Sequence, residues 1–358
     1  MRRSFLFVGV LLFVFEAGAQ LQPGFNKMEA IALLKVSAQF GGSSYAAEMG
    51  VPPGYKKLYR SKVVGLDNCW ELWQTDTRIP IISIRGTTKE QLSWLANFYA
   101  AMIPAKGQLQ ISATEQFDYD FAEDPKAAVH IGWTIATAFL SKDILPKIDS
   151  FYKAGSHEFY IVGFSQGGAI SYLLTSYLHG LQRTGKLPMD IRFKTYCGAA
   201  PKPGNLYFAY EYEAITQNGW AYNVVNAADW VPQTPFSVQT LSDLPPVNPF
   251  NNADVIIKKQ KWPKRWALDI AFKKLTKPGN KTKKAYQKYL GDYVFKSVKK
   301  ALPGFHPPKY FNSSDYVRTG NTITLLPKEE YYQQFPQDNS KPFIHHFHSA
   351  YLYLLEKM

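Results

Sequence analysis

The sequence is poor in cysteine and in the residue patterns that bind metals. Its 358 residues include only Cys69 and Cys197. Two thiols cannot build a thiolate metal cage, and no His-x-x-x-His pair is present, so we expect no metal in catalysis. Both cysteines lie in apolar, strand-like stretches, which favours buried free thiols, although export would permit them to form a disulfide.

Long hydrophobic runs are also missing after the first residues. No segment beyond residue 19 has 18 consecutive apolar residues, so we expect no later membrane-spanning helix. Residues 1–19 join a short basic start, an apolar run of 12 residues and the small residues Ala17–Ala19. This pattern is typical of a cleaved secretory signal peptide and predicts a secreted or periplasmic protein. The alternative is an uncleaved anchor.

Net charge is absent from most of the chain. The formal charge is +13, and residues 258–300 hold 15 Lys and Arg against two acids, leaving 26 basic and 26 acidic residues elsewhere. We predict a basic helical insertion at about 255–302, formed by two helices with a turn at 276–282. It would contact an anionic membrane through 258–300, and we expect no nucleic-acid partner. Alternatively, it is a solvated basic face whose apolar stripe packs on the protein.

Strand-like and helix-like segments alternate along the rest of the chain. The strand candidates are β-rich or apolar runs, and amphipathic or apolar helix candidates, such as 26–40 and 90–103, lie between them. This order predicts an α/β fold with a mainly parallel sheet and flanking helices. We expect one domain over 20–358, because no repeat or low-complexity linker divides it.

A serine between two glycines stands where one predicted strand ends and a helix begins. The segment "YIVGFSQGGAIS" places Ser165 in a G-x-S-x-G pattern. Such a pattern is typical of a nucleophile elbow, in which the serine lies on a sharp turn. Short matches also occur by chance, so the alternative is a glycine-rich turn without chemistry.

A nucleophilic serine needs a base, an acid that orients the base, and donors for the oxyanion. Asp229 follows a buried strand at the predicted carboxyl edge of the sheet, which makes it the acid candidate. The oxyanion donors would be Thr87, after Gly86, and the N–H of Gln166. Three histidines near the C-terminus remain candidates for the base: His345, His346 and His348.

Several dispersed motifs resemble those of class 3 lipases, the fungal-lipase-like branch of the α/β hydrolases. They are "IRGTT", "VHIGW", "GFSQGGA", "GAAPKPGN", "NAADWVP" and "HSAY", in that order. The resemblance implies an α/β-hydrolase fold with Ser165 as nucleophile, Asp229 as acid and Thr87 in the oxyanion hole. It implies His348 as base, because Tyr351 follows three residues later, and a lid at 89–105.

Two features depart from the family pattern. The family elbow usually reads G-H-S-L-G, whereas "GFSQGG" is typical of acyl-protein thioesterases, and the basic insertion lengthens the interval between Asp229 and His348. The sequence predicts a cofactor-free serine hydrolase of lipid or other acyl esters. The alternatives are a carboxylesterase or thioesterase of small acyl esters, and an inactive lipase-like fold that binds anionic membranes.

Overall fold

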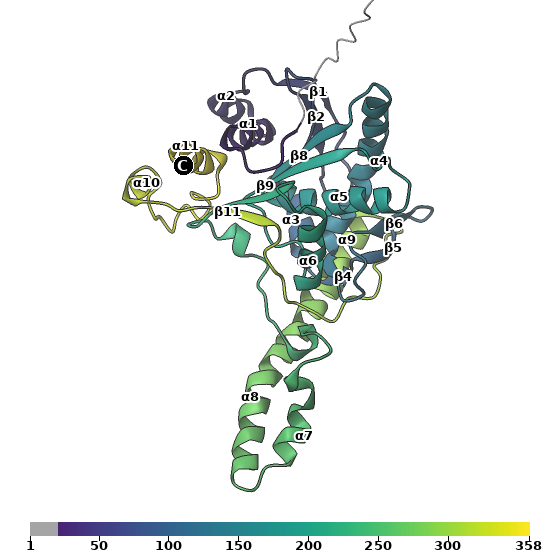
Figure 1. The fold of residues 1–358 in the computed structure, drawn as a ribbon, viewed down its shortest axis with the longest axis vertical. Helices are drawn as coiled ribbons and strands as arrows, with labels where there is room; N and C mark the ends of the chain where they lie inside the picture. The colour runs from purple at the N-terminus through teal and green to yellow at the C-terminus, as the bar shows by residue number, and fades with distance from the viewer. Residues whose placement is uncertain (1–20) are drawn as a thin grey trace, which may run out of the picture.

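A seven-stranded sheet forms the centre of the molecule in the computed structural model, which describes residues 21–358 (Figure 1). The signal peptide expected over 1–19 lies outside the described residues. In spatial order the strands are β1 (Lys56–Arg60), β2 (Trp70–Gln74), β3 (Pro80–Ile84), β8 (Glu158–Phe164), β9 (Arg192–Gly198), β10 (Ala221–Asn226) and β11 (Asn321–Leu325). β2 is antiparallel to both of its neighbours, whereas β3 and the four strands that follow it in space are parallel. The expected mainly parallel sheet is confirmed.

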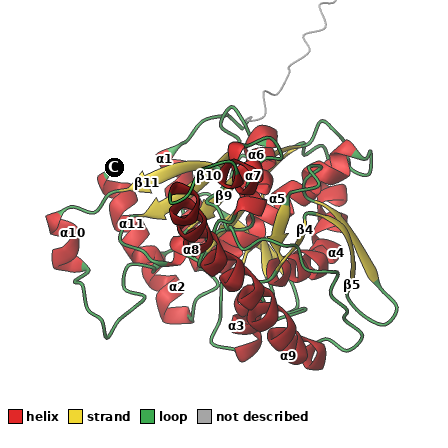
Figure 2. Ribbon diagram, turned by 90° about the horizontal axis from the view of Figure 1, so that it is seen from below, coloured by secondary structure: helices red, strands yellow, loops and turns green. Residues whose placement is uncertain are grey.

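Helices cover both faces of this sheet (Figures 1 and 2). The helices outside the insertion are α1 (Lys27–Ala38), α2 (Ser43–Met49), α3 (Gln91–Phe98), α4 (Ile131–Lys153), α5 (Gln166–Arg183), α6 (Leu206–Ile215), α10 (Glu329–Gln334) and α11 (His348–Lys357). Two short strand pairs lie beside the main sheet: β4 (Met102–Pro104) with β7 (Ala128–His130), and β5 (Lys106–Gln110) with β6 (Gln116–Asp120).

Alternating side chains of the strands divide the core into two clusters. On β8, Phe159 and Ile161 pack with residues of α4 and α5, whereas Tyr160, Val162 and Phe164 pack with residues of α1 and α11. Successive strand side chains point to opposite faces, so a strand buried on both sides reads as one apolar run. The sheet is therefore covered on both sides, and the loops at its carboxyl edge are left to carry the chemistry.

The basic insertion is helical, but the turn expected at 276–282 is wrong. The chain turns earlier, between α7 (Ala253–Lys258) and α8 (Lys264–Ala285). Pro278 lies inside α8, where a proline removes one backbone donor, and the helix continues on both sides of it. α8 then runs into a π-helix, Tyr286–Tyr293, and into α9 (Val294–Ala301).

In Figure 1, α7 and α8 project from the body as a hairpin. Within the described residues, no helix has the length and apolar character needed to cross a bilayer. Cys69 and Cys197 are free thiols, and both are buried.

Candidate active site

Ser165 occupies a strained turn between β8 and α5. Its backbone angles are φ 59° and ψ −127°, outside the regions that L-residues usually adopt. A Cβ on Gly163 would lie 2.1 Å from the carbonyl oxygen of Gly167, and one on Gly167 would lie 2.2 Å from that of Ile84. Both glycines are therefore required by close backbone packing. The structure gives Ser165 the strand-turn-helix setting that the sequence pattern indicated.

His346 joins Ser165 to Asp229. Its Nε2 lies 2.8 Å from the Ser165 Oγ, and its Nδ1 lies 2.7 Å from the Asp229 Oδ2. Since a carboxylate only accepts, Nδ1 carries a proton and Nε2 accepts one from the serine hydroxyl. This is the arrangement in which an imidazole can remove the serine proton.

The Asp229 carboxylate is fully buried and accepts three hydrogen bonds. Oδ2 accepts from the Tyr351 hydroxyl at 2.7 Å as well as from His346, and Oδ1 accepts from the Val231 N–H at 2.9 Å. Burial, and then the charge of Asp229, raise the pKa of Tyr351 far above its usual value, so this phenol remains a donor. These bonds offset the cost of burying the carboxylate and fix its orientation.

The expectation that His348 is the base is wrong in geometry. His348 is the first residue of α11, where its ring stacks on Phe164 at 3.9 Å between centroids and its Nδ1 lies 3.2 Å from the Tyr45 hydroxyl. Burial, with a smaller contribution from His346, lowers the pKa of His348 to about 3. Its side chain packs beneath the elbow, whereas His346 lies in the turn before the helix and reaches the serine.

The remaining candidate, His345, also lies away from the serine. Its Nδ1 is 2.8 Å from the Tyr331 hydroxyl, and its carbonyl oxygen accepts from the Asn226 side chain. Of the three C-terminal histidines, His346 therefore bonds to both Ser165 and Asp229.

The two expected oxyanion donors stand on neighbouring loops. Because β3 pairs with β8 in parallel, with Ile84 opposite Gly163, the loops after these strands leave the sheet together. Gln166 is the first residue of α5, where a backbone N–H has no intrahelical acceptor. The Thr87 hydroxyl accepts from the Asn97 Nδ2 at 2.9 Å, so its own proton remains available for donation.

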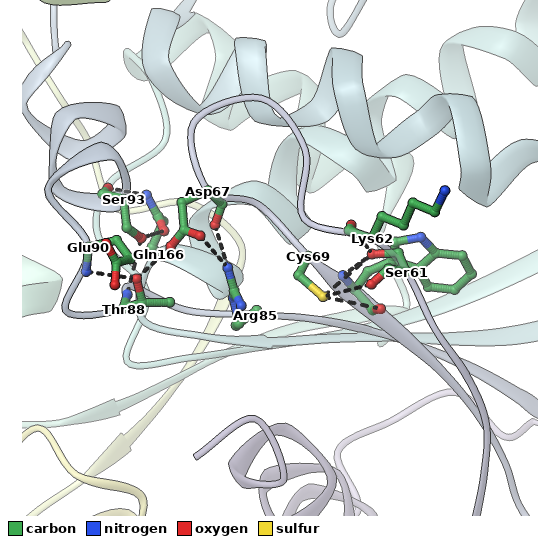
Figure 3. Close-up of polar contacts among 10 residues, drawn as sticks. Ser61, Lys62, Asp67, Cys69, Arg85, Thr88, Glu90, Ser93 and Gln166 are labelled. Atoms are coloured by element: carbon green, nitrogen blue, oxygen red, sulfur yellow. Dashed lines mark hydrogen bonds and ion pairs between the residues drawn. The ribbon is translucent and has the colours of Figure 1, made fainter. Parts of the chain in front are cut away.

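A polar network fixes these two loops to each other (Figure 3). The buried Gln166 side chain donates to the Ser93 carbonyl oxygen at 3.1 Å and accepts from the Ser93 Oγ at 3.4 Å. Ser93 in turn accepts from the Thr88 N–H, and the Thr88 hydroxyl donates to Asp67, which pairs with Arg85 at 2.9 Å. Sequence reasoning missed this network because Ser93 and Asp67, which link the two motif loops, belong to no motif themselves.

The helix within the expected lid segment, 89–105, is α3. It is bonded to the body at both ends: Ser93 binds Gln166, and the Asn97 side chain binds Thr87 and accepts from the Trp133 Nε1 at 3.1 Å. Any movement of α3 would therefore break the buried Gln166–Ser93 bonds and the partly buried bond that holds the Thr87 hydroxyl.

Four aromatic side chains lie next to one another beside the triad; we call them the aromatic rim: Trp94, Phe98 and Trp230, which are exposed, and Phe343, which is half-buried. Phe343 lies 6.1 Å from His346 between ring centroids, and it contacts both Trp94 and Trp230. Phe98 stacks on Trp94 and is 56% exposed. The rim places apolar surface beside the catalytic histidine and serine.

Residues 81–239 match the family model described as lipase (class 3). Over this segment the chain is similar to class 3 lipases. The segment carries Ser165, Asp229 and the expected oxyanion donors, while His346 lies beyond it. The match to a lipase family and the Ser165–His346–Asp229 arrangement support a serine ester hydrolase.

Similar solved structures are fungal lipases. A fungal lipase-inhibitor complex shares 18% identity, covers 59% of this chain and 74% of its own, and has a TM-score of 0.45. A Rhizomucor miehei lipase-propeptide complex shares 18% identity, with 60% of this chain and 66% of the complex's chain covered and a TM-score of 0.43. The lipase of Rhizopus microsporus var. chinensis shares 20% identity, with 58% of this chain and 69% of its own covered and a TM-score of 0.41. A comparison with curated protein sequences gave no match.

Proposed function

We propose that this protein is an exported lipase that hydrolyses acyl esters of lipids through Ser165, His346 and Asp229. The observation that carries the proposal is the position of His346, which bonds to the serine through one ring nitrogen and to the buried carboxylate through the other. We place the catalytic unit in one domain, residues 20–358, with residues 1–19 as a signal peptide.

Acylation begins when the Ser165 Oγ attacks the ester carbonyl carbon while its proton passes to the His346 Nε2. Asp229 stabilises the resulting imidazolium through Nδ1, and Tyr351 and Val231 hold Asp229 in place. The oxyanion accepts hydrogen bonds from the Gln166 N–H and from Thr87. Collapse of the tetrahedral intermediate returns the proton from Nε2 to the departing alcohol and leaves an acyl-enzyme.

Deacylation repeats these steps with water as the nucleophile. His346 removes a proton from water, the hydroxide attacks the acyl carbon, and the same donors hold the second oxyanion. Ser165 then leaves with the proton from Nε2, which releases the carboxylic acid.

The aromatic rim supports a proposal for the acyl chain of the substrate. Trp94 and Trp230 are 37% and 43% exposed and lie on two sides of Phe343, which contacts the catalytic histidine. Such a surface suits a hydrocarbon chain better than a small polar acid. We therefore expect a preference for medium or long acyl chains.

The test compares turnover of p-nitrophenyl esters of graded chain length by wild type and Ser165→Ala. Wild type should favour longer chains, and the variant should lose at least about 10³ in kcat while staying folded. A fluorophosphonate probe should label wild type alone. Preference for acetate over longer esters would indicate a small-ester hydrolase, and labelling of the variant would contradict Ser165 as nucleophile.

A further inference from the structure

The α7–α8 hairpin projects from the body and contributes little to the core. Figure 1 shows it extending away from the sheet, with the turn between α7 and α8 at its far end. Most residues from 253 to 281 are exposed, and Ile257 is the buried apolar residue among them. Packing alone therefore does not explain the distal half of the hairpin.

The far end, residues 258–266, reads "KKQKWPKRW" and is called here the tip. It contains five basic residues and no acid, namely Lys258, Lys259, Lys261, Lys264 and Arg265. Trp262 is 81% exposed and Trp266 is 63% exposed. The tip thus presents two large indoles to solvent within a wholly basic stretch.

The base of the hairpin is different and is explained by packing. Lys283 is buried and donates to the Ser242 Oγ at 2.7 Å and to the Thr240 Oγ1 at 3.3 Å. Tyr286 donates to the Phe236 carbonyl oxygen, and Val294 packs against the main core. The alternative of a stripe that packs on the protein therefore holds for the base but leaves the tip unexplained.

We infer that the tip docks the enzyme on a bilayer that contains anionic lipids. Lysine and arginine side chains are attracted to the negative surface potential of such a bilayer. Tryptophan prefers the membrane-water interface, where the indole ring lies at headgroup level. A soluble polyanion would satisfy the cations but would leave Trp262 and Trp266 without an apolar partner, and this favours the lipid surface.

The inference extends the proposed lipase function, because a lipid ester is a substrate found in or on such surfaces. It does not depend on turnover. Binding is therefore measured with the full-length Ser165→Ala protein, which leaves the vesicles chemically unchanged during the assay.

The experiment is co-sedimentation with vesicles of phosphatidylcholine alone and of phosphatidylcholine mixed with phosphatidylglycerol. We expect binding to the anionic vesicles at low salt and its loss at 1 M salt, where the Debye length falls to about 3 Å. Changing Lys258, Lys259, Lys261 and Lys264 to Gln should weaken binding at least about tenfold.

A matched control removes the same number of charges from the body. Lys56, Lys62, Lys186 and Lys328 are all exposed and lie outside the hairpin. Changing these four to Gln should leave vesicle binding within about twofold, because these lysines lie outside the hairpin and the tip makes the contact. Equal losses in the two quadruple variants would overturn the tip as the docking element, since net charge alone would then explain binding.

The tryptophans are tested by quenching with brominated lipids. Tryptophan emission of the bound protein should be quenched, and the quenching should fall in the double variant Trp262→Ala with Trp266→Ala. Equal sedimentation with both vesicle types, or binding to heparin but not to vesicles, contradicts the inference. Vesicle binding by a protein whose wild type hydrolyses no ester would refute the proposed function and leave the docking intact.

Discussion

The carboxyl edge of the sheet and the α7–α8 hairpin both expose tryptophan, yet they are built in opposite ways. At the edge, α3 exposes Trp94 but is fixed by the Gln166–Ser93 and Asn97–Thr87 hydrogen bonds. The hairpin exposes Trp262 on a tip that few contacts restrain. Catalysis needs atoms held in position, so its surroundings are cross-linked by hydrogen bonds. Attraction between charges and a surface needs no fixed geometry, and an isolated hairpin suffices.

The largest effect is expected at His346. His346→Ala should lower kcat for a soluble p-nitrophenyl ester by at least about 10³, because it removes the base from an otherwise intact site. His348→Gln, two residues away, should retain kcat within about tenfold, since His348 packs beneath the elbow. Steady-state measurement of kcat on folded samples of the two variants shows which histidine is the base. The reverse pattern would mean that the structure places the wrong histidine at the serine.

The next effect tests the oxyanion hole. Thr87→Val removes a hydroxyl with little change in shape and should cost about 10² in kcat, as loss of one such donor does. Thr88→Val is the matched control, because its hydroxyl donates to Asp67 rather than toward the serine. It should lower thermal stability and reduce kcat less than Thr87→Val does, because it acts only through the position of the loop. Similar kcat values for wild type and Thr87→Val would exclude the Thr87 side chain as a donor.

A smaller effect is expected on the pH dependence of folding stability. Burial lowers the pKa of His130 and of His348 to about 3. Both stay neutral in the folded protein while the unfolded chain binds protons below about pH 6.5. Stability should therefore fall as pH drops from 6.5 toward 3, by up to about 1.4 kcal/mol per pH unit for each histidine.

Urea unfolding of His130→Gln between pH 8 and pH 4 measures this contribution. The variant should be less stable than wild type at pH 8, since it loses the packing of His130 against Trp133. The difference in unfolding free energy between wild type and the variant should become smaller as the pH falls. A gap that stays constant over this range would show that His130 titrates alike in the folded and unfolded states.

The smallest effect is expected from removing the distal hairpin. Replacing 253–277 by a short Gly-Ser linker should leave kcat on a soluble ester within about threefold and shift Tm little, because this segment buries few side chains. Differential scanning calorimetry and ester hydrolysis measure both. A large loss of activity would show that the hairpin supports the catalytic edge. It would contradict the view that the two regions are structurally independent.

Much of the fold follows from local patterns in the sequence. The apolar run of β8 and the G-x-S-x-G pattern around Ser165 indicate a buried strand followed by a sharp turn, because both patterns are read from residues that are adjacent in the sequence. The start of α1 is similar: the Asn26 side chain accepts from the N–H groups of Met28 and Glu29, as a helix-capping residue should. Such features depend on a few adjacent positions.

The base could not be chosen from spacing alone. His348 and Tyr351 fit the spacing of the family, but α11 begins at His348, so this side chain points toward Phe164 instead of toward Ser165. The choice depends on where a helix starts to within two residues, which sequence patterns rarely resolve. The bonds from Ser93 and Asn97 were missed for a related reason: their partners are distant in sequence.

The two buried free thiols can serve as probes of local unfolding. Cys197 lies in β9 at the centre of the sheet, and burial raises the pKa of its thiol far above the usual value, whereas Cys69 precedes β2 near one side of the sheet. A thiol reagent can reach either sulfur only when the surrounding structure opens. The labelling rate of Cys69 would then report loosening at the antiparallel side, and that of Cys197 the separation of the central strands.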